Sequence, residues 1–407
     1  MLVSPYTPGA TPHHLAGRTM ELRAIEDHLA PVIAYGRAAS GLLVLHGPRG
    51  VGKTSLLDSA VNAAREEHGF VTAWTACQRG EPFLADVASR VGRALERADL
   101  MGKKARLTVE KVAAEVSVPT FVKFSAQLSR AGAATDRPAP PSGAVSAVED
   151  LLHESAVLAR GDGSRRGSGL IVAIDELHAG QVGELAVLLN AIQNLHHDSG
   201  NNPLAVLGAG IPAVRGLLPS AATFGERSRW REVAPLDEPA LRELLTVPAA
   251  ELKVSWHPDA VRAVIEASER YPHFVHVLGE GTWLTARPEA GGHITLAHSQ
   301  VGIEHGRAEI KDLYMARWAS ATPAQQAVLV AIAELAGDGI EPEARLLDGH
   351  GDEVERLAVA GQVRREATLV PEPGGQAALL QHGLEGVVHL GAPLQGVPER
   401  RRADRSH

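Results

Sequence analysis

Short apolar runs alternate with helical patterns along the first 236 residues of the chain. Residues 42–45, 70–76, 170–174 and 203–210 form apolar runs of the length that buried strands have. After the first run, apolar residues recur on one face of a helix at Leu56, Leu57, Ala60, Val61 and Ala64. With a last strand expected at 229–236, this alternation predicts an α/β fold, in which a parallel sheet is flanked by helices.

The pattern changes after residue 236, because only helical spacing follows. Asp237 is a suitable N-cap residue ahead of Pro239, and the segments after it place apolar residues three and four positions apart. We therefore expect an α/β domain over residues 1–236 and a small helical lid over 237–320.

Four parts of the chain have weaker patterns. Residues 133–143 are rich in proline and are expected to form a flexible linker inside the first domain. The lysines of the insert 99–124 predict either a basic surface or, as we favour, a solvated helix face. Residues 321–370 begin with one more helical segment, whereas 371–407 are rich in glycine and proline and are expected to be disordered.

The stretch GPRGVGKT joins the first predicted strand to the first helix. Gly47, Gly52, Lys53 and Thr54 satisfy the pattern G-x-x-x-x-G-K-[ST] of a phosphate-binding loop, or P-loop. Lys53 would reach the outer phosphates of a nucleotide, and Thr54 would offer its hydroxyl to magnesium. The residues expected to surround the phosphates are Gly47, Pro48, Arg49, Gly50, Val51, Gly52, Lys53, Thr54 and Ser55. The alternative is a glycine-rich turn that binds nothing, but the flanking strand and helix favour the nucleotide site.

A second candidate segment, IVAIDE, is a buried strand that ends in two carboxylates. Asp175 would hold Mg²⁺, and Glu176 would orient or deprotonate the attacking water, so the pair favours hydrolysis. The alternative is that Asp175 caps the next helix and Glu176 is a solvated acid of its first turn. His178 is interpreted as a surface histidine. The chain lacks the N-K-x-D pattern that reads guanine, so ATP is the expected nucleotide.

With these motifs in place, residues 5–337 resemble an AAA+/STAND-type P-loop ATPase of the bacterial initiator-like, or origin-recognition-like, group. The resemblance rests on GPRGVGKT, IVAIDE and LAGRTMEL, residues 15–22. It implies that Gly17 and Arg18 help to hold the adenine. It also matches Arg227 to an arginine finger, which stabilises the transferring phosphoryl group and often acts from a neighbouring subunit. The alternative for Arg227 is a solvated surface arginine.

The chain departs from this group at two positions. The sensor arginine of the lid is not evident near residues 271–273, and Ala209 stands where a polar sensor is expected. These departures favour a slow, switch-like hydrolase. Residues 321–335 resemble the first helix of a winged helix, so an ATP-controlled DNA-binding regulator is an alternative, as is a scaffold that binds nucleotide without hydrolysis.

Composition narrows the remaining choices. The net charge of −8 gives no general affinity for nucleic acid, so any contact with DNA would need a local patch. Cys77 is the single cysteine, which excludes an intrachain disulfide and fits a reducing compartment. The sequence has no signal-peptide pattern and no apolar run of about 20 residues, so we expect a cytoplasmic protein with no membrane contact and an unidentified protein partner.

Overall fold

The computed structural model describes residues 2–12, 14–117, 121, 123–125, 127–128, 139–161, 167–197, 200–323, 326–327 and 329–330. The chain divides into two compact units, Met1–Lys311 and Asp312–His407. The first unit contains all the strands and nearly all the helices described below. Most of the expected winged-helix region and the whole expected tail lie outside the described residues, as does much of the predicted proline-rich linker.

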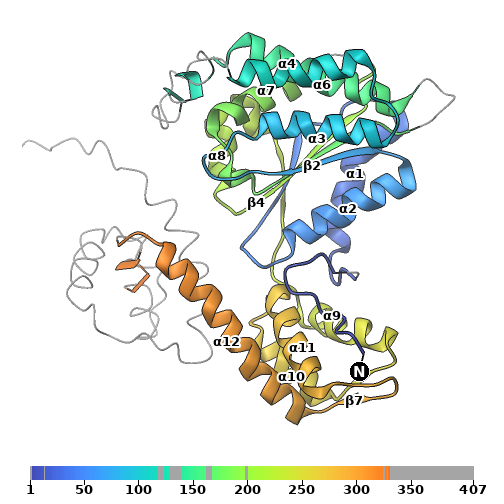
Figure 1. Cartoon of the computed structure of the whole chain (residues 1–407), viewed down its shortest axis with the longest axis vertical. Coiled ribbons are helices and arrows are strands. Elements are labelled where there is room, and N and C mark those ends of the chain that lie inside the picture. Colours follow the sequence, from blue (N-terminus) through green and yellow to red (C-terminus); the bar gives the residue numbers. More distant parts are fainter. Residues whose placement is uncertain are drawn as a thin grey trace, which may run out of the picture. The chain divides into compact units, whose positions relative to one another are not determined.

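A five-stranded parallel sheet forms the centre of the first unit (Figure 1). Its strands in sequence order are β1 Leu42–His46, β2 Val71–Ala76, β3 Leu170–Asp175, β4 Leu204–Gly210 and β5 Arg229–Glu232. They lie in the order β2-β3-β4-β1-β5. Every residue of β1, β3 and β4 is buried, because helices cover both faces of these inner strands. The predicted α/β fold is confirmed.

Helices cover the sheet on two sides. Figure 1 shows α3, α4 and α6 stacked together on one side, with α1 and α2 on the other. The helices of this part are α1 Thr19–Tyr35, α2 Lys53–His68, α3 Leu84–Arg97, α4 Lys103–Ser117, α6 Ser142–Arg160, α7 Val182–His197 and α8 Val214–Ala221, with the 3-10 helices η1 Leu177–Ala179 and η2 Thr223–Arg227. Because parallel strands all run the same way, the loops that follow them gather at one edge of the sheet.

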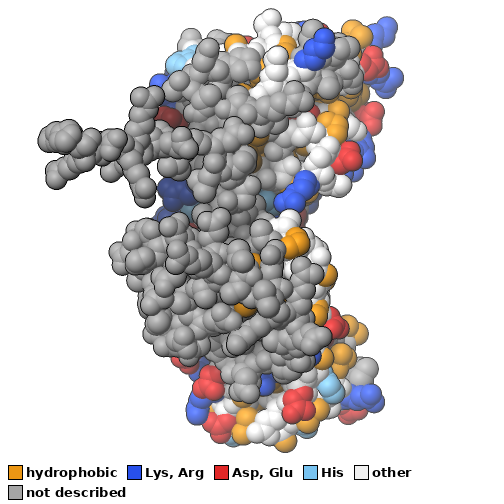
Figure 2. Space-filling view, turned by 90° about the vertical axis from the view of Figure 1, so that its left-hand side faces the viewer, with side chains coloured by type: hydrophobic (Ala, Val, Ile, Leu, Met, Phe, Trp, Pro, Cys, Tyr) orange, Lys and Arg blue, Asp and Glu red, His pale blue; other side chains and the backbone are white. Residues whose placement is uncertain are grey.

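The lysines of the insert face acidic residues of the neighbouring helix. Lys104 pairs with Glu154, and Lys111 of α4 pairs with Asp150 of α6 at 2.7 Å. Figure 2 shows Lys and Arg side chains among Asp and Glu side chains at this end of the molecule. Exposed pairs of this kind contribute little to stability, but they balance the local charge. The described part of the insert therefore matches a solvated face better than a basic surface.

A buried carboxylate caps the start of α3. Glu184 of α7 accepts hydrogen bonds from the backbone N–H groups of Phe83, at 2.6 Å, and Leu84, at 3.4 Å. Its side chain is fully buried. Burial raises the pKa of Glu184 to about 7, although the two backbone hydrogen bonds act in the opposite direction.

This pKa predicts a pH-dependent contribution to stability. The carboxyl has its ordinary pKa of 4.5 in the unfolded chain, so between about pH 4.5 and 7 the folded protein keeps a proton that the unfolded chain releases. The unfolding free energy should fall as pH rises through this window, by on the order of 3 kcal/mol from this group. Glu184→Gln should remove that part of the fall, because the amide oxygen can still accept from Phe83.

The measurement is urea unfolding at pH 5 and pH 8. Glu96→Gln, an exposed change in α3, is the matched control and should keep the wild-type pH dependence. An identical pH dependence in Glu184→Gln and wild type would show that Glu184 does not titrate in this way.

The segment after residue 236 forms a second hydrophobic core within the same unit. Its helices are α9 Glu238–Glu251, α10 Pro258–Ala267, α11 Pro272–Ala286 and α12 Leu296–Ser320. Asp237 caps α9 as predicted, since its Oδ1 accepts from the N–H of Ala240 at 2.9 Å. A two-stranded ladder, β6 Ser255–Trp256 and β7 His293–Ile294, adds to the helices. Strands of two residues are too short to leave a periodic pattern in the sequence. The domain boundary at 236 stays a prediction.

The N-terminal strap, residues 2–12 and 14–17, packs into the lid core, where Tyr6 and Ala16 are buried. Tyr6 is 1% exposed, and its hydroxyl donates to the Leu245 carbonyl at 2.6 Å. The same oxygen accepts from Trp256 Nε1 at 2.9 Å, and Trp283 Nε1 donates to the Leu2 carbonyl at 3.2 Å. The strap thus joins the lid to the start of α1.

None of the described helices has the length and hydropathy that crossing a membrane requires.

Candidate functional site

The predicted P-loop connects the end of β1 to the first turn of α2. Gly50 and Gly52 have φ angles of 82° and 91°, which a side chain would strain. A Cβ atom on Gly47 would lie 2.2 Å from the Val233 carbonyl oxygen, so only glycine fits there. Lys53 is the first residue of α2, with Thr54 and Ser55 next along the helix. The N-terminus of α2 therefore adds its positive end to the loop, as anion sites require.

Lys53 is buried beneath the loop. Its Nζ donates to the carbonyl oxygens of Gly47, at 2.8 Å, and Pro48, at 2.7 Å. Its side chain is 7% exposed. These bonds hold the ammonium at the start of α2, where the dipole of the helix and the charge of the side chain add together.

The two residues predicted to hold magnesium lie in contact, although 121 positions separate them. Thr54 Oγ1 donates to Asp175 Oδ2 at 2.6 Å, and the Glu176 N–H donates to Asp175 Oδ1 at 2.8 Å. Burial raises the pKa of Asp175, while these two hydrogen bonds lower it. A hydroxyl and a carboxylate side by side are the hard oxygen donors that Mg²⁺ prefers, so the residues present fit this ion.

Glu176 follows Asp175 in a left-handed backbone conformation, with φ 51°. Its side chain is 36% exposed, and Oε2 lies 3.2 Å from Nε2 of His178 and 3.6 Å from Nη2 of Arg49. The P-loop and the end of β3 are therefore joined through a second contact besides the one between Thr54 and Asp175.

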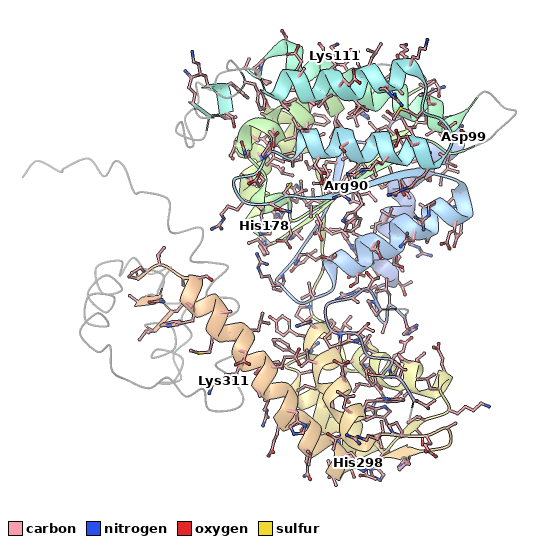
Figure 3. All side chains as sticks on the ribbon, in the orientation of Figure 1. Arg90, Asp99, Lys111, His178, His298 and Lys311 are labelled. Carbon is pink, nitrogen blue, oxygen red and sulfur yellow. The ribbon has the colours of Figure 1, made fainter. Side chains whose placement is uncertain are left out.

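His178 belongs to this site, so the interpretation as a surface histidine is wrong. Its side chain is only 10% exposed, and Nδ1 lies 3.5 Å from the Ile211 nitrogen just after β4. Burial, together with the positive charges of Arg49 and Lys53, lowers the pKa of His178 to about 4. Figure 3 shows His178 at the end of the sheet where the P-loop enters α2, whereas Lys111 projects outward from α4. The tight turn of η1 directs His178 back over the end of the sheet that carries the P-loop. No sequence pattern predicted this geometry.

Gly17 and Arg18 lie between the P-loop and the lid. The Arg18 guanidinium is buried and donates to the Val51 carbonyl at 2.7 Å and to Glu21 at 3.2 Å. Burial lowers the pKa of Arg18, and Glu21 raises it. A Cβ atom on Gly17 would lie 2.5 Å from Cβ of Ala240, so glycine permits the close approach of α9.

The lid also touches the P-loop directly. The backbone N–H of His273, in the first turn of α11, donates to the Gly50 carbonyl at 3.2 Å. The expected sensor position is therefore next to the loop. Arg270, which precedes it, donates from Nε to the Leu236 carbonyl at 3.1 Å.

Arg227 lies at the opposite edge of the sheet from the P-loop. It is exposed, ends η2, and has its carbonyl oxygen beside Gly41, just before β1 begins. The P-loop follows the other end of β1, and a strand of five residues spans about 16 Å at about 3.3 Å per residue. The structure does not bring Arg227 to the P-loop of its own chain.

Another arginine, which the motifs did not indicate, does lie at the P-loop edge. Arg215 is exposed on α8, and its Cζ lies 5.6 Å from the ring centre of Trp230. His46, the residue before the P-loop, packs edge-on against the same ring at 5.9 Å. Burial lowers the pKa of His46, and the nearby Arg215 charge lowers it further. Arg215 follows soon after β4 in the sequence, and this position is the one feature of the sequence that could have indicated it.

Residues 14–207 match the family model of the AAA ATPase domain. No curated protein matches the chain. Among solved structures, the ORC2 protein of Aeropyrum pernix in ADPNP–ADP complexes is 14% identical over 93% of this chain and 88% of its own, with a TM-score of 0.53. Its ADP form is 15% identical over 94% and 88%, with a TM-score of 0.50. At these identities the likeness shows a shared fold. The predicted resemblance to initiator-like AAA+ ATPases is confirmed at this level.

Proposed function

We propose that the first unit binds ATP with Mg²⁺ and hydrolyses it slowly, as a switch. The observation that carries this proposal is the bond between Thr54 and Asp175, which lies beside the buried Lys53 and the half-exposed Glu176. A glycine-rich turn without a ligand would not need a buried ammonium and a buried carboxylate at one edge of the sheet, since buried charges are costly unless they serve a partner.

Each residue has a distinct part in this proposal. The P-loop N–H groups and Lys53 would bind the phosphates, while Thr54 and Asp175 would hold the ion. Magnesium, when bound, neutralises charge on the phosphate oxygens. Glu176 would orient the attacking water and accept its proton. The adenine preference is supported by the absence of a guanine-reading motif, and the related ORC2 structures hold ADPNP and ADP.

Contacts of the P-loop with the lid support the switch. Arg18 and His273 hold the carbonyls of Val51 and Gly50, so a change in the loop on nucleotide binding would reach both the strap and α11. Two features favour slow turnover. Ala209 has no polar group for the phosphate, and Arg270, the lid arginine just before α11, donates to the Leu236 carbonyl.

The remaining partners stay predictions. Arg227 is exposed and far from its own P-loop, so the proposed arginine finger would have to act on the nucleotide of a second copy of the chain. A DNA-binding regulator depends on a winged helix that lies mostly outside the described residues. A scaffold that does not hydrolyse ATP would bind nucleotide in the same loop, so turnover separates it from our proposal.

The test is ATP binding and phosphate release with Mg²⁺ in wild type and Lys53→Ala. Loss of a charge-assisted contact worth about 1.5–3 kcal/mol should weaken ATP binding by about 10- to 150-fold. Lys103→Ala, an exposed change in α4, is the matched control and should bind as wild type. Undiminished binding by Lys53→Ala, or equal affinity for GTP, would contradict the proposed site.

A further inference from the structure

Glu176 has two neighbours that compete for one oxygen. His178 Nε2 and Arg49 Nη2 both approach Oε2, and the two nitrogens are themselves 3.2 Å apart. None of the described residues contacts Oε1 within hydrogen-bond distance. Which imidazole nitrogen carries the proton decides whether Nε2 donates to Glu176 or accepts from Arg49.

Each tautomer of His178 leaves one of its two donor neighbours facing an N–H group. An arginine can only donate, so a bond from Arg49 would require Nε2 to be bare and Nδ1 to carry the proton. That proton would then face the N–H of Ile211, which is also a donor. With the proton on Nε2, Nδ1 accepts from Ile211, and Nε2 lies 3.2 Å from Glu176 Oε2 and equally 3.2 Å from the Arg49 Nη2 donor. The Arg49 side chain is 45% exposed and can turn its N–H groups away from Nε2, whereas the backbone N–H of Ile211 is fixed, so we favour the proton on Nε2.

We infer that His178 is a positioning residue for Glu176: it holds Oε2 through Nε2–H and directs Oε1 toward the attacking water. The inference rests on the proposed ATPase function and adds a residue to it. Ile211, just after β4, fixes the imidazole, and His178 in turn fixes the carboxylate. The catalytic base is thereby tied to the end of β4, the strand that carries Ala209 in place of a polar sensor.

Glu176 needs such a partner because its own surroundings fix it poorly. Its side chain is 36% exposed, and its backbone is in the left-handed region. Arg49 belongs to the P-loop, so bound phosphates would compete with Glu176 for its charge. His178 is not part of the loop and can hold the carboxylate whether or not nucleotide is bound.

The chemical step is an ordinary hydrolysis. As the water oxygen bonds to the γ-phosphorus, the bond from phosphorus to the bridging oxygen breaks, and its electron pair leaves with ADP. The water proton passes to Oε1 of Glu176, which later releases it to solvent. His178 keeps its proton throughout, because it only holds Oε2.

Three replacements separate positioning from packing. Gln places its amide nitrogen where Nε2 lies and can donate to Glu176, whereas Asn reaches only the Nδ1 position and Leu offers neither group. We expect His178→Gln to keep kcat within about threefold of wild type, and His178→Asn and His178→Leu to lower kcat by about 10- to 100-fold with KM unchanged. In a Glu176→Gln background, His178→Leu should cause no further loss. His68→Gln, an exposed change at the end of α2, is the control.

A readout without turnover tests the contact itself. Ring ¹⁵N shifts of His178 in the full chain should report the Nε2–H tautomer, and Glu176→Gln should move the Nε2 shift but not the Nδ1 shift. Turnover in wild type with full kcat in His178→Leu, or an Nδ1–H tautomer, would overturn this inference alone. Absence of wild-type turnover would overturn the proposed hydrolysis together with the catalytic part of the inference, and the ¹⁵N shifts would still decide the contact.

Discussion

Glu176→Gln is expected to lower kcat for ATP hydrolysis by about two to four orders of magnitude, the usual contribution of a positioned general base. Glutamine has nearly the same shape, so ATP affinity should stay close to that of wild type. The charge that binds phosphate comes from Lys53 and α2, and the carboxylate that would hold magnesium is Asp175. The Glu176 side chain takes part in neither contact, and its backbone N–H still bonds Asp175 in the variant, so the substitution should affect the chemical step alone.

Single-turnover phosphate release together with equilibrium binding of a fluorescent ATP analogue would measure both quantities. Glu110→Gln, an exposed change in α4, controls for the loss of one negative charge. A variant that loses binding and turnover together would show that Glu176 supports the fold of the site. A variant that keeps wild-type kcat would remove Glu176 from the mechanism.

Tyr6→Ala is expected to lower the unfolding free energy of the lid by about 3–5 kcal/mol, as for other buried aromatic residues replaced by alanine. The ring fills the lid core, edge-on to Trp256 and Trp283, with centroid distances of 6.1 and 6.0 Å. Its hydroxyl bonds the Leu245 carbonyl and the Trp256 N–H. Tyr6→Phe keeps the ring and should cost only about 1–3 kcal/mol, because these two buried groups lose their partner.

Urea unfolding followed by tryptophan fluorescence suits this test, since Trp256 and Trp283 lie in the lid core. Tyr35→Ala removes a tyrosine whose side chain is 75% exposed and should leave the transition unchanged. Equal transitions for Tyr6→Ala and Tyr35→Ala would show that the strap does not stabilise the lid.

The sequence predicted those parts of the site that depend on local pattern and on strand direction. The P-loop is one continuous motif, so its turn and helix follow from neighbouring residues. Asp175 and Thr54 come together because parallel strands bring the loops at their carboxyl ends to one edge of the sheet. The same reasoning separates Arg227 from the P-loop, because it precedes β5 where Lys53 follows β1.

Other parts depend on contacts that no local pattern records. Tyr6 bonds a carbonyl 239 positions away, and a short apolar segment near the N-terminus gives no indication of its partner. His178 enters the site because Glu176 adopts a left-handed conformation, which is uncommon for a residue with a side chain. Both features required the three-dimensional arrangement to be known.

The chain passes between the sheet and the lid at two places, and these lie side by side. The strap leaves the lid through Gly17, whose Cβ position is 3.3 Å from Cδ2 of Leu236, where the chain enters the lid after β5. Because the two connections are adjacent, they act as a single attachment point, about which the lid could turn but from which it could not move away. With Gly17 packed against α9, we expect rotation about Gly17 and Leu236 to be the main movement open to the lid. Such a rotation about Gly17 and Leu236 would move the first turn of α11 relative to the P-loop, which it contacts at Gly50.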